Sequence, residues 1–245
     1  MPSRDWFRTV FWLIPTIAVY TIVLGSWSIT ASLVEREGRF AHWCARAWSW
    51  LILATTGVDV ETRGLDRLVP GATYVVVSNH QSIYDIPVLF QHLPYQLRII
   101  AKASIGHFPF LGWHLRRAGH LLVDRQNPDP LRILKRWERS VTRGLSLLVF
   151  PEGTRSADGR VGRFKGGSFL LAIRAGLPVV PVAVSGSRHV MRKGRLTTRP
   201  GLVRVTVHDP IVTAGLEPTI ENARRLAQQA RGAIEPDVGE SWMGR

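Results

Sequence analysis

The strongest constraint on the fold is a repeating pattern that begins after Gly57, in which short apolar runs alternate with longer stretches of helical spacing. The short runs are rich in β-branched residues, as buried strands are, and the last long stretch repeats apolar residues from Ile220 to Ile234. This alternation predicts an α/β fold with a mixed, largely parallel sheet flanked by helices. The expected strands are Val58–Thr62, Thr73–Ser78, Leu97–Ala101, His120–Asp124, Leu145–Phe150, Val179–Val184 and Val203–Val207, with a further helix over Pro130–Arg143.

The N-terminal stretch differs from this pattern. Thr9–Val34 holds 26 residues without a charge, and as a helix it would extend about 39 Å, more than a hydrocarbon core of roughly 30 Å. A second apolar stretch, Ala47–Val58, is too short to span alone. A cleaved signal peptide and a buried core helix are alternatives, but the long apolar run favours membrane association, either as a span or as a hydrophobic two-helix hairpin. The kink expected at Pro15 favours the hairpin, a helix pair docked on a membrane.

These patterns predict three regions: membrane-associating helices over residues 1–57, an α/β domain over 58–234 and a loose tail over 235–245. The net charge of +14, from 32 basic and 18 acidic residues, predicts an acidic partner. The basic run Arg188–Arg204 lacks interleaved aromatic residues, so we expect an anionic phospholipid membrane rather than nucleic acid. Cys44 is the only cysteine, which excludes an intrachain disulfide, and the histidine spacing predicts no metal site.

A candidate base and its orienting carboxylate follow the second expected strand, where His80 precedes Asp85 by five residues. An imidazole can take a proton from a hydroxyl group while a carboxylate on its other nitrogen fixes the tautomer. The two side chains can meet if His80 lies in the turn and Asp85 in the first helical turn. Alternatively, Ser82 and Asp85 form a capping box that only supports the helix start.

A second candidate site follows the fifth expected strand, in the sequence Phe150-Pro151-Glu152-Gly153-Thr154-Arg155-Ser156. It supplies a carboxylate, a flexible glycine, a hydroxyl and a guanidinium group, which together can hold a phosphate and a neighbouring hydroxyl. An ordinary polar loop is the alternative. Cations also end two other strands, at Lys102 and at Arg125.

Taken in order, these junctions resemble the glycerolipid acyltransferase family, which includes the 1-acylglycerol-3-phosphate acyltransferases. The resemblance covers about Val58 to Pro210, and four blocks in the family's order carry it. The blocks are Asn79–Asp85 with its H-x4-D pattern, Gly119–Arg125, Phe150–Ser156 and Val180–Val184. The apolar N-terminus is similar to the membrane-docking helices of bacterial members.

The resemblance implies direct acyl transfer without a covalent enzyme intermediate. His80, oriented by Asp85, would deprotonate the sn-2 hydroxyl of a lysophosphatidate, which would then attack the thioester of acyl-CoA or acyl carrier protein. No cofactor beyond this acyl donor is implied. Because both donors are cytosolic, the family implies a site on the cytoplasmic face of the cell membrane.

The resemblance also implies roles for the other candidates. Arg155, Lys102 and Arg125 would hold the glycerol phosphate, while Glu152 would order its loop or hold the glycerol backbone, and Gly153 and Thr154 would shape the turn. Two alternatives remain at this stage. The acceptor could be glycerol 3-phosphate, a lyso-ornithine lipid or another lysophospholipid, or the chain could be a noncatalytic lipid-binding protein of the same fold.

Overall fold

A computed structural model of the chain describes residues 3–35, 37–124, 133, 135–137, 141 and 143–239. Within them, seven strands form one sheet in the order β1-β7-β6-β2-β5-β3-β4. The seven expected strands are therefore present, with bounds shifted by one or two residues at most ends. The strands are β1 (Val58–Arg63), β2 (Val75–Ser78), β3 (Leu97–Lys102), β4 (Leu121–Val123), β5 (Ser146–Val149), β6 (Val179–Ser185) and β7 (Gly201–Val207).

The sheet is mixed but largely parallel, as predicted. Each described pair of neighbouring strands is parallel except β6 with β7, so β1 and β7 run opposite to the other five strands. The central strands β2 and β5 are buried along their whole length, which is why they read as continuous apolar runs. Because β6, β2, β5 and β3 are parallel neighbours, the loops that follow them meet at one edge of the sheet.

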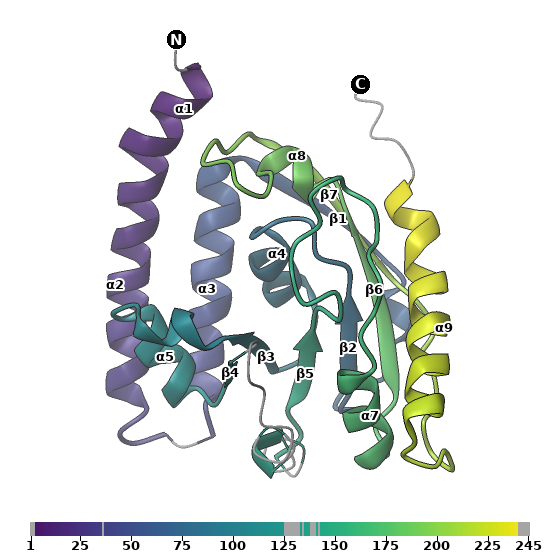
Figure 1. Ribbon diagram of the computed structural model, residues 1–245. Helices are drawn as coiled ribbons and strands as arrows, with labels where there is room; N and C mark the ends of the chain where they lie inside the picture. Colours follow the sequence, from purple (N-terminus) through teal and green to yellow (C-terminus); the bar gives the residue numbers. More distant parts are fainter. Residues whose placement is uncertain are drawn as a thin grey trace.

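Helices cover both faces of the sheet (Figure 1). On one face, α4 (Asp85–His92) and α5 (Leu111–Arg117) contribute to a core with α3 (Arg39–Thr56). On the other, α7 (Gly167–Arg174) and α9 (Ile220–Gly239) enclose a second core. The helix expected over 130–143 lies partly outside the described residues, and its Trp137 is fully buried in this second core. Shorter elements are two 3₁₀ turns, Leu65–Arg67 and Ala103–His107, and α8 (Ser187–Val190).

The N-terminal helix runs from Arg4 to Ala31, as α1 (Arg4–Arg8), a π-helical turn (Thr9–Leu13) and α2 (Ile14–Ala31). The wide turn immediately precedes Pro15, which has no N–H to donate, so the helix widens there instead of ending. In the described part of the chain, this is the one helix whose length and composition would let it cross a membrane. Core helices and signal sequences pass the same test.

α2 and α3 lie side by side as a helical hairpin on one flank of the molecule (Figure 1). The two helices are buried to different extents. Ile52 and Leu53 of α3 belong to the domain core, whereas only 22% of the most apolar window of the N-terminal helix is buried. The outer surface of the hairpin carries large exposed apolar side chains, a feature typical of interaction sites. They include Phe7, Phe11, Trp12, Trp27, Trp43 and Trp50.

Two predicted boundaries can be compared with the elements. α3 ends at Thr56 and β1 begins at Val58, and Gly57 between them adopts a left-handed conformation with φ of 73°. The loose tail predicted from residue 235 begins too early, because α9 continues to Gly239 through Pro236. Its apolar face also continues, since Val238 packs on the same core as Ile234, one helical turn earlier. Residues 240–245 of the predicted tail lie outside the described residues.

Candidate active site

Asn79 determines where the chain leaves β2. Its side-chain Nδ2 donates to the carbonyl oxygen of Val184, and its Oδ1 accepts from the Val184 amide, both at 2.8 Å. The buried amide thus continues the pairing of β2 with β6 for one residue beyond the strand. The next residue, His80, is therefore held at the edge of the sheet where the loops meet.

His80 and Asp85 are in direct contact, with Nδ1 2.7 Å from Oδ2. Asp85 is fully buried and is the first residue of α4, so the histidine lies in the turn and the aspartate in the first helical turn. Because an ionised carboxylate only accepts hydrogen bonds, Nδ1 carries the proton and Nε2 keeps its lone pair. This is the tautomer that a general base requires.

The same carboxylate oxygen also supports the start of α4. Asp85 Oδ2 accepts from the backbone N–H groups of Gln81 at 2.7 Å and Ser82 at 2.9 Å. The two interpretations of this sequence, an orienting carboxylate and a helix cap, are therefore compatible. Three hydrogen bonds to one oxygen hold the carboxylate in a single orientation toward the imidazole.

The imidazole is also held from its other side. The His80 ring stacks on Phe150, with ring centroids 4.0 Å apart and planes at 19°, and its side chain is 13% exposed. The His80 carbonyl oxygen accepts from the Ser156 amide at 2.7 Å. The loop after β2 is thus attached to the loop after β5, and the ring has little freedom to rotate.

Glu152 joins these two loops. Its Oε1 accepts from the His80 amide at 2.8 Å, and its Oε2 accepts from the Gly162 amide at 3.0 Å. Burial raises the pKa of this carboxyl group, while the two N–H groups oppose the rise. Both oxygens accept from the backbone, so these contacts favour the loop-ordering role over the glycerol-binding role.

The predicted phosphate-binding residues of the loop that follows β5 come directly after Glu152. Gly153 adopts a φ of 75°, which favours glycine, and its amide closes a turn onto the Phe150 carbonyl oxygen at 2.9 Å. The guanidinium group of Arg155 has no hydrogen-bond or ion-pair partner among the described residues. Arg125, the remaining predicted phosphate ligand, lies outside the described residues. Lys102, at the end of β3, lines the same cavity as His80.

Two residues that sequence reasoning assigned only to a basic surface brace this loop. Lys193 Nζ donates to the Arg155 carbonyl oxygen at 2.7 Å and to Thr154 Oγ1 at 3.1 Å. Arg188 Nη2 donates to the Ala157 carbonyl oxygen at 2.7 Å. Both cations follow β6, whose carboxyl end lies beside that of β2. The carboxyl ends of parallel strands meet at one edge of a sheet, and this rule could have indicated the two cations. Using it requires knowing that β6 lies next to β2 in the sheet.

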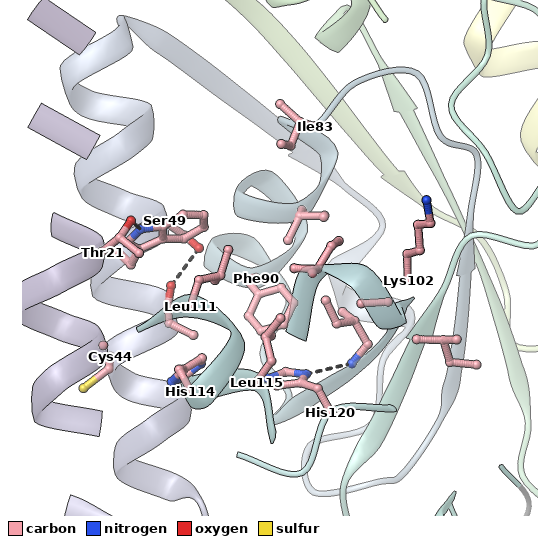
Figure 2. A pocket seen from close by; sticks show the side chains of 18 of the residues that line it. Thr21, Cys44, Ser49, Ile83, Phe90, Lys102, Leu111, His114, Leu115 and His120 are labelled. Atoms are coloured by element: carbon pink, nitrogen blue, oxygen red, sulfur yellow. Dashed lines mark hydrogen bonds between the residues drawn. The ribbon is translucent and has the colours of Figure 1, made fainter. Parts of the chain in front are cut away.

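A cavity of about 210 Å³ opens beside His80 and extends between the sheet and the helical hairpin. Figure 2 shows Lys102 on one side and the hairpin residues Thr21, Cys44 and Ser49 on the other. Most of its wall is apolar. The apolar lining includes Leu24, Ala45, Trp48, Ile83, Ile86, Phe90, Ile99, Ile105, Leu111, Leu115 and Phe150. In the described part of the chain, no three His, Cys, Asp or Glu side chains cluster as metal ligands would.

Comparisons with known proteins place the chain in a family. A family model described as Acyltransferase matches residues 59–185, slightly more than half of the chain. A 1-acyl-sn-glycerol-3-phosphate acyltransferase from Pseudomonas aeruginosa is 31% identical over 201 residues, which cover 81% of this chain and 76% of the relative. The chain belongs to the acyltransferase family.

Other members of the acyltransferase family are also similar. The chloroplastic 1-acyl-sn-glycerol-3-phosphate acyltransferase BAT2 from Brassica napus is 35% identical over 199 residues, or 80% of this chain. The chain spans about half the length of these longer relatives: 57% of this protein, 51% of an algal relative and 49% of a second plant relative. The crystal structure of the 1-acyl-sn-glycerophosphate acyltransferase PlsC from Thermotoga maritima superposes with a TM-score of 0.82 at 26% identity, covering 98% of both chains.

Proposed function

We propose that this chain transfers a fatty acyl group from a thioester to the sn-2 hydroxyl of 1-acylglycerol 3-phosphate, giving phosphatidate. The names of the relatives in Pseudomonas aeruginosa and Brassica napus support this acceptor. The observation that carries the proposal is the His80–Asp85 contact of 2.7 Å, which leaves Nε2 of a partly exposed imidazole as a base at the mouth of an apolar cavity.

In the proposed reaction, the acceptor hydroxyl oxygen attacks the thioester carbonyl carbon while its proton passes to His80 Nε2. The Asp85 carboxylate stabilises the imidazolium that forms, as a buried anion next to a cation does. The tetrahedral intermediate then collapses, the carbon–sulfur bond breaks, and the imidazolium returns its proton to the departing thiolate. An ester and a free thiol result, so the reaction needs no oxidant and no covalent intermediate on the protein.

The surroundings of His80 supply places for both substrates. The apolar cavity suits the acyl chain of the donor, because burying methylene groups stabilises binding by about 0.8 kcal/mol each. We assign the acceptor phosphate to Lys102 and Arg155, with Arg125 as a third cation. The donor is acyl-CoA or acyl carrier protein, both acidic, which suits a chain with a charge of +14.

We further propose that the helical hairpin docks on the anionic cytoplasmic face of the cell membrane. The exposed aromatic side chains of α2 and α3 support this orientation, because tryptophan and phenylalanine favour the membrane interface. The lysophosphatidate acceptor would then reach His80 from the membrane surface, and the donor from the cytosol.

The proposal is tested by an acyl-transfer assay with purified full-length protein and anionic vesicles. The donor is palmitoyl-CoA or palmitoyl-(acyl carrier protein). Acceptors are 1-acylglycerol 3-phosphate, glycerol 3-phosphate, lysophosphatidylcholine and a lyso-ornithine lipid. We expect phosphatidate to form fastest. Faster acylation of another acceptor would move the assignment to that acceptor, and no transfer to any acceptor would favour a noncatalytic lipid-binding protein.

Changing Arg155 to methionine should raise the KM for 1-acylglycerol 3-phosphate about tenfold or more, because a charge-assisted bond to the phosphate is lost. The KM for the acyl donor should change little. Steady-state kinetics with each substrate varied in turn measure both effects. The matched control is Arg160→Met, an exposed arginine farther along the same loop. An equal rise in KM for both variants would show that only bulk charge matters.

Lys193 should act as a positioning residue for the loop that carries Arg155. Lys193→Met removes two hydrogen bonds to that loop, so we expect a several-fold rise in the acceptor KM with kcat nearly unchanged. Arg195→Met removes the same charge from an exposed neighbour in the same segment and is the control. A partial return of the acceptor KM in Lys193→Arg would support the positioning role. A similar rise in the acceptor KM in Lys193→Met and Arg195→Met would contradict it.

A further inference from the structure

The cavity beside His80 contains two buried imidazoles that the proposed reaction does not use. His114 and His120 both line it, and they are only 8% and 2% exposed. In the view of Figure 2 both rings lie away from the Lys102 amino group, on the side of α5. The wall around them is otherwise largely apolar, so their polar atoms require an explanation.

His120 presents a hydrogen-bond donor that lacks an acceptor. Its Nδ1 accepts from the backbone N–H of Ile99 at 3.0 Å, so in the neutral ring the proton sits on Nε2. Among the residues that the structure describes, none accepts a hydrogen bond from this Nε2. This N–H is open to the cavity, where water or a ligand can accept from it.

His114 is similar but adaptable. Its Nδ1 lies 2.6 Å from Ser28 Oγ of α2, and either atom can donate, since the hydroxyl rotates. Its Nε2 has no partner within the described part of the chain and is an acceptor or a donor according to the tautomer. The centroids of the two imidazoles are 5.9 Å apart, and both rings line the same cavity.

Both rings remain uncharged at neutral pH. Burial lowers the pKa of His114 to about 4 and that of His120 well below its ordinary value, and the nearby guanidinium group of Arg98 lowers both further. Arg98 is itself buried beneath this region. The two neutral imidazoles therefore favour a neutral ligand group that can both accept and donate a hydrogen bond over an anionic one.

The other polar side chains of the cavity wall from the hairpin are already satisfied. Thr21 Oγ1 donates to the Ile17 carbonyl oxygen and accepts from Trp48 Nε1. Ser49 Oγ donates to the Ala45 carbonyl oxygen at 2.7 Å. These hydroxyls bond within the hairpin, so the two imidazoles are the polar groups of this region that await a partner from the cavity.

We propose that His114 and His120 form a subsite for a hydroxyl group carried on the acyl chain of the donor. The inference rests on the proposed acyl transfer and narrows its substrate class to hydroxylated acyl thioesters. A hydroxyl oxygen accepts from His120 Nε2–H, and its proton is donated to His114 Nε2 while His114 Nδ1–H donates to Ser28 Oγ. An unsubstituted chain leaves both nitrogens unpaired, and sites built to bond a hydroxyl discriminate against analogues that lack it.

The test compares palmitoyl-CoA with matched donors hydroxylated near the thioester, at mid-chain and at the terminus. We expect one hydroxylated donor to show kcat/KM about tenfold or more above palmitoyl-CoA. His120→Asn keeps an oxygen that can accept from the Ile99 amide but removes Nε2, and His114→Asn removes the second nitrogen. Each variant should bring the ratio close to one. His107→Asn, an exposed histidine on the preceding 3₁₀ turn, should leave the ratio unchanged.

A binding measurement separates this inference from the proposed function. Free palmitic acid and its hydroxylated counterparts are titrated against a fluorescent fatty acid held by the full-length protein. Tighter displacement by one hydroxylated acid, lost in His120→Asn, would support the subsite even if no acyl transfer occurred. Equal or weaker use of every hydroxylated donor by the wild-type protein, with equal displacement, would overturn the inference. So would a preference that His120→Asn and His114→Asn both retain.

Discussion

Replacing His80 with glutamine should lower kcat for phosphatidate formation by about 10³-fold, within the range expected when a general base is removed. Glutamine fills much of the space of the imidazole beside Phe150 but cannot accept the hydroxyl proton at neutral pH. His80→Ala should lose at least as much. Both are measured as initial rates with palmitoyl-CoA and 1-acylglycerol 3-phosphate on anionic vesicles.

The appropriate controls concern attachment and folding. Vesicle co-sedimentation should be unchanged in both His80 variants, because the exposed aromatic residues of the hairpin lie on other elements. Thermal unfolding should remain cooperative. Turnover within a few fold of the wild-type protein would contradict the assignment of His80 as the base, and with it the acyl-transfer mechanism.

Asp85→Asn should also lower kcat, by about 10² to 10⁴-fold, and should destabilise the protein by about 1–3 kcal/mol. The kinetic loss arises because a neutral amide cannot stabilise the imidazolium. The stability loss arises because Asp85 Oδ1 is buried without a partner in the described structure, so an amide nitrogen placed there would bury two unpaired N–H groups. The opposite orientation would turn that nitrogen toward the amides of Gln81 and Ser82.

Kinetics and chemical denaturation measure the two effects separately. Asp59→Asn is the matched control, because Asp59 is exposed on β1 and its loss removes the same charge away from the site. Unchanged kcat in Asp85→Asn, accompanied by reduced stability, would mean that the carboxylate serves only as the cap of α4. Loss of activity with unchanged stability would contradict the prediction that an amide at Asp85 Oδ1 buries unpaired N–H groups.

The sheet and the His80–Asp85 contact were predictable because their signals are local. The strands β2, β5 and β6 are continuous apolar runs with turn residues at their ends, and five residues separate the histidine from the aspartate. The end of α9 was misjudged for an equally local reason. Pro236 and the charged residues around it obscured an apolar face that continues to Val238.

The contacts that assemble the site were not predictable in the same way. Glu152 binds the amide of His80 across 72 positions of sequence, and Lys193 binds the loop of Arg155 across 38. Such pairs depend on the strand order β6-β2-β5, which is decided by packing of both sheet faces rather than by any local pattern. The same holds for the cavity that His114 and His120 line, because residues of α2, α3 and β3 also form its wall.

Both helices of the hairpin contribute side chains to the wall of the cavity beside His80. This affects how a more soluble form of the protein can be designed. A shortened, detergent-free enzyme would ordinarily be sought by deleting residues 1–57 as a dispensable anchor. Here that deletion would also remove Leu24, Ala45 and Trp48 from the cavity wall, and Ile52 and Leu53 from the core. Solubility is better sought by polar replacement of outward-facing aromatic residues such as Trp12 and Trp27, which keeps both helices in place.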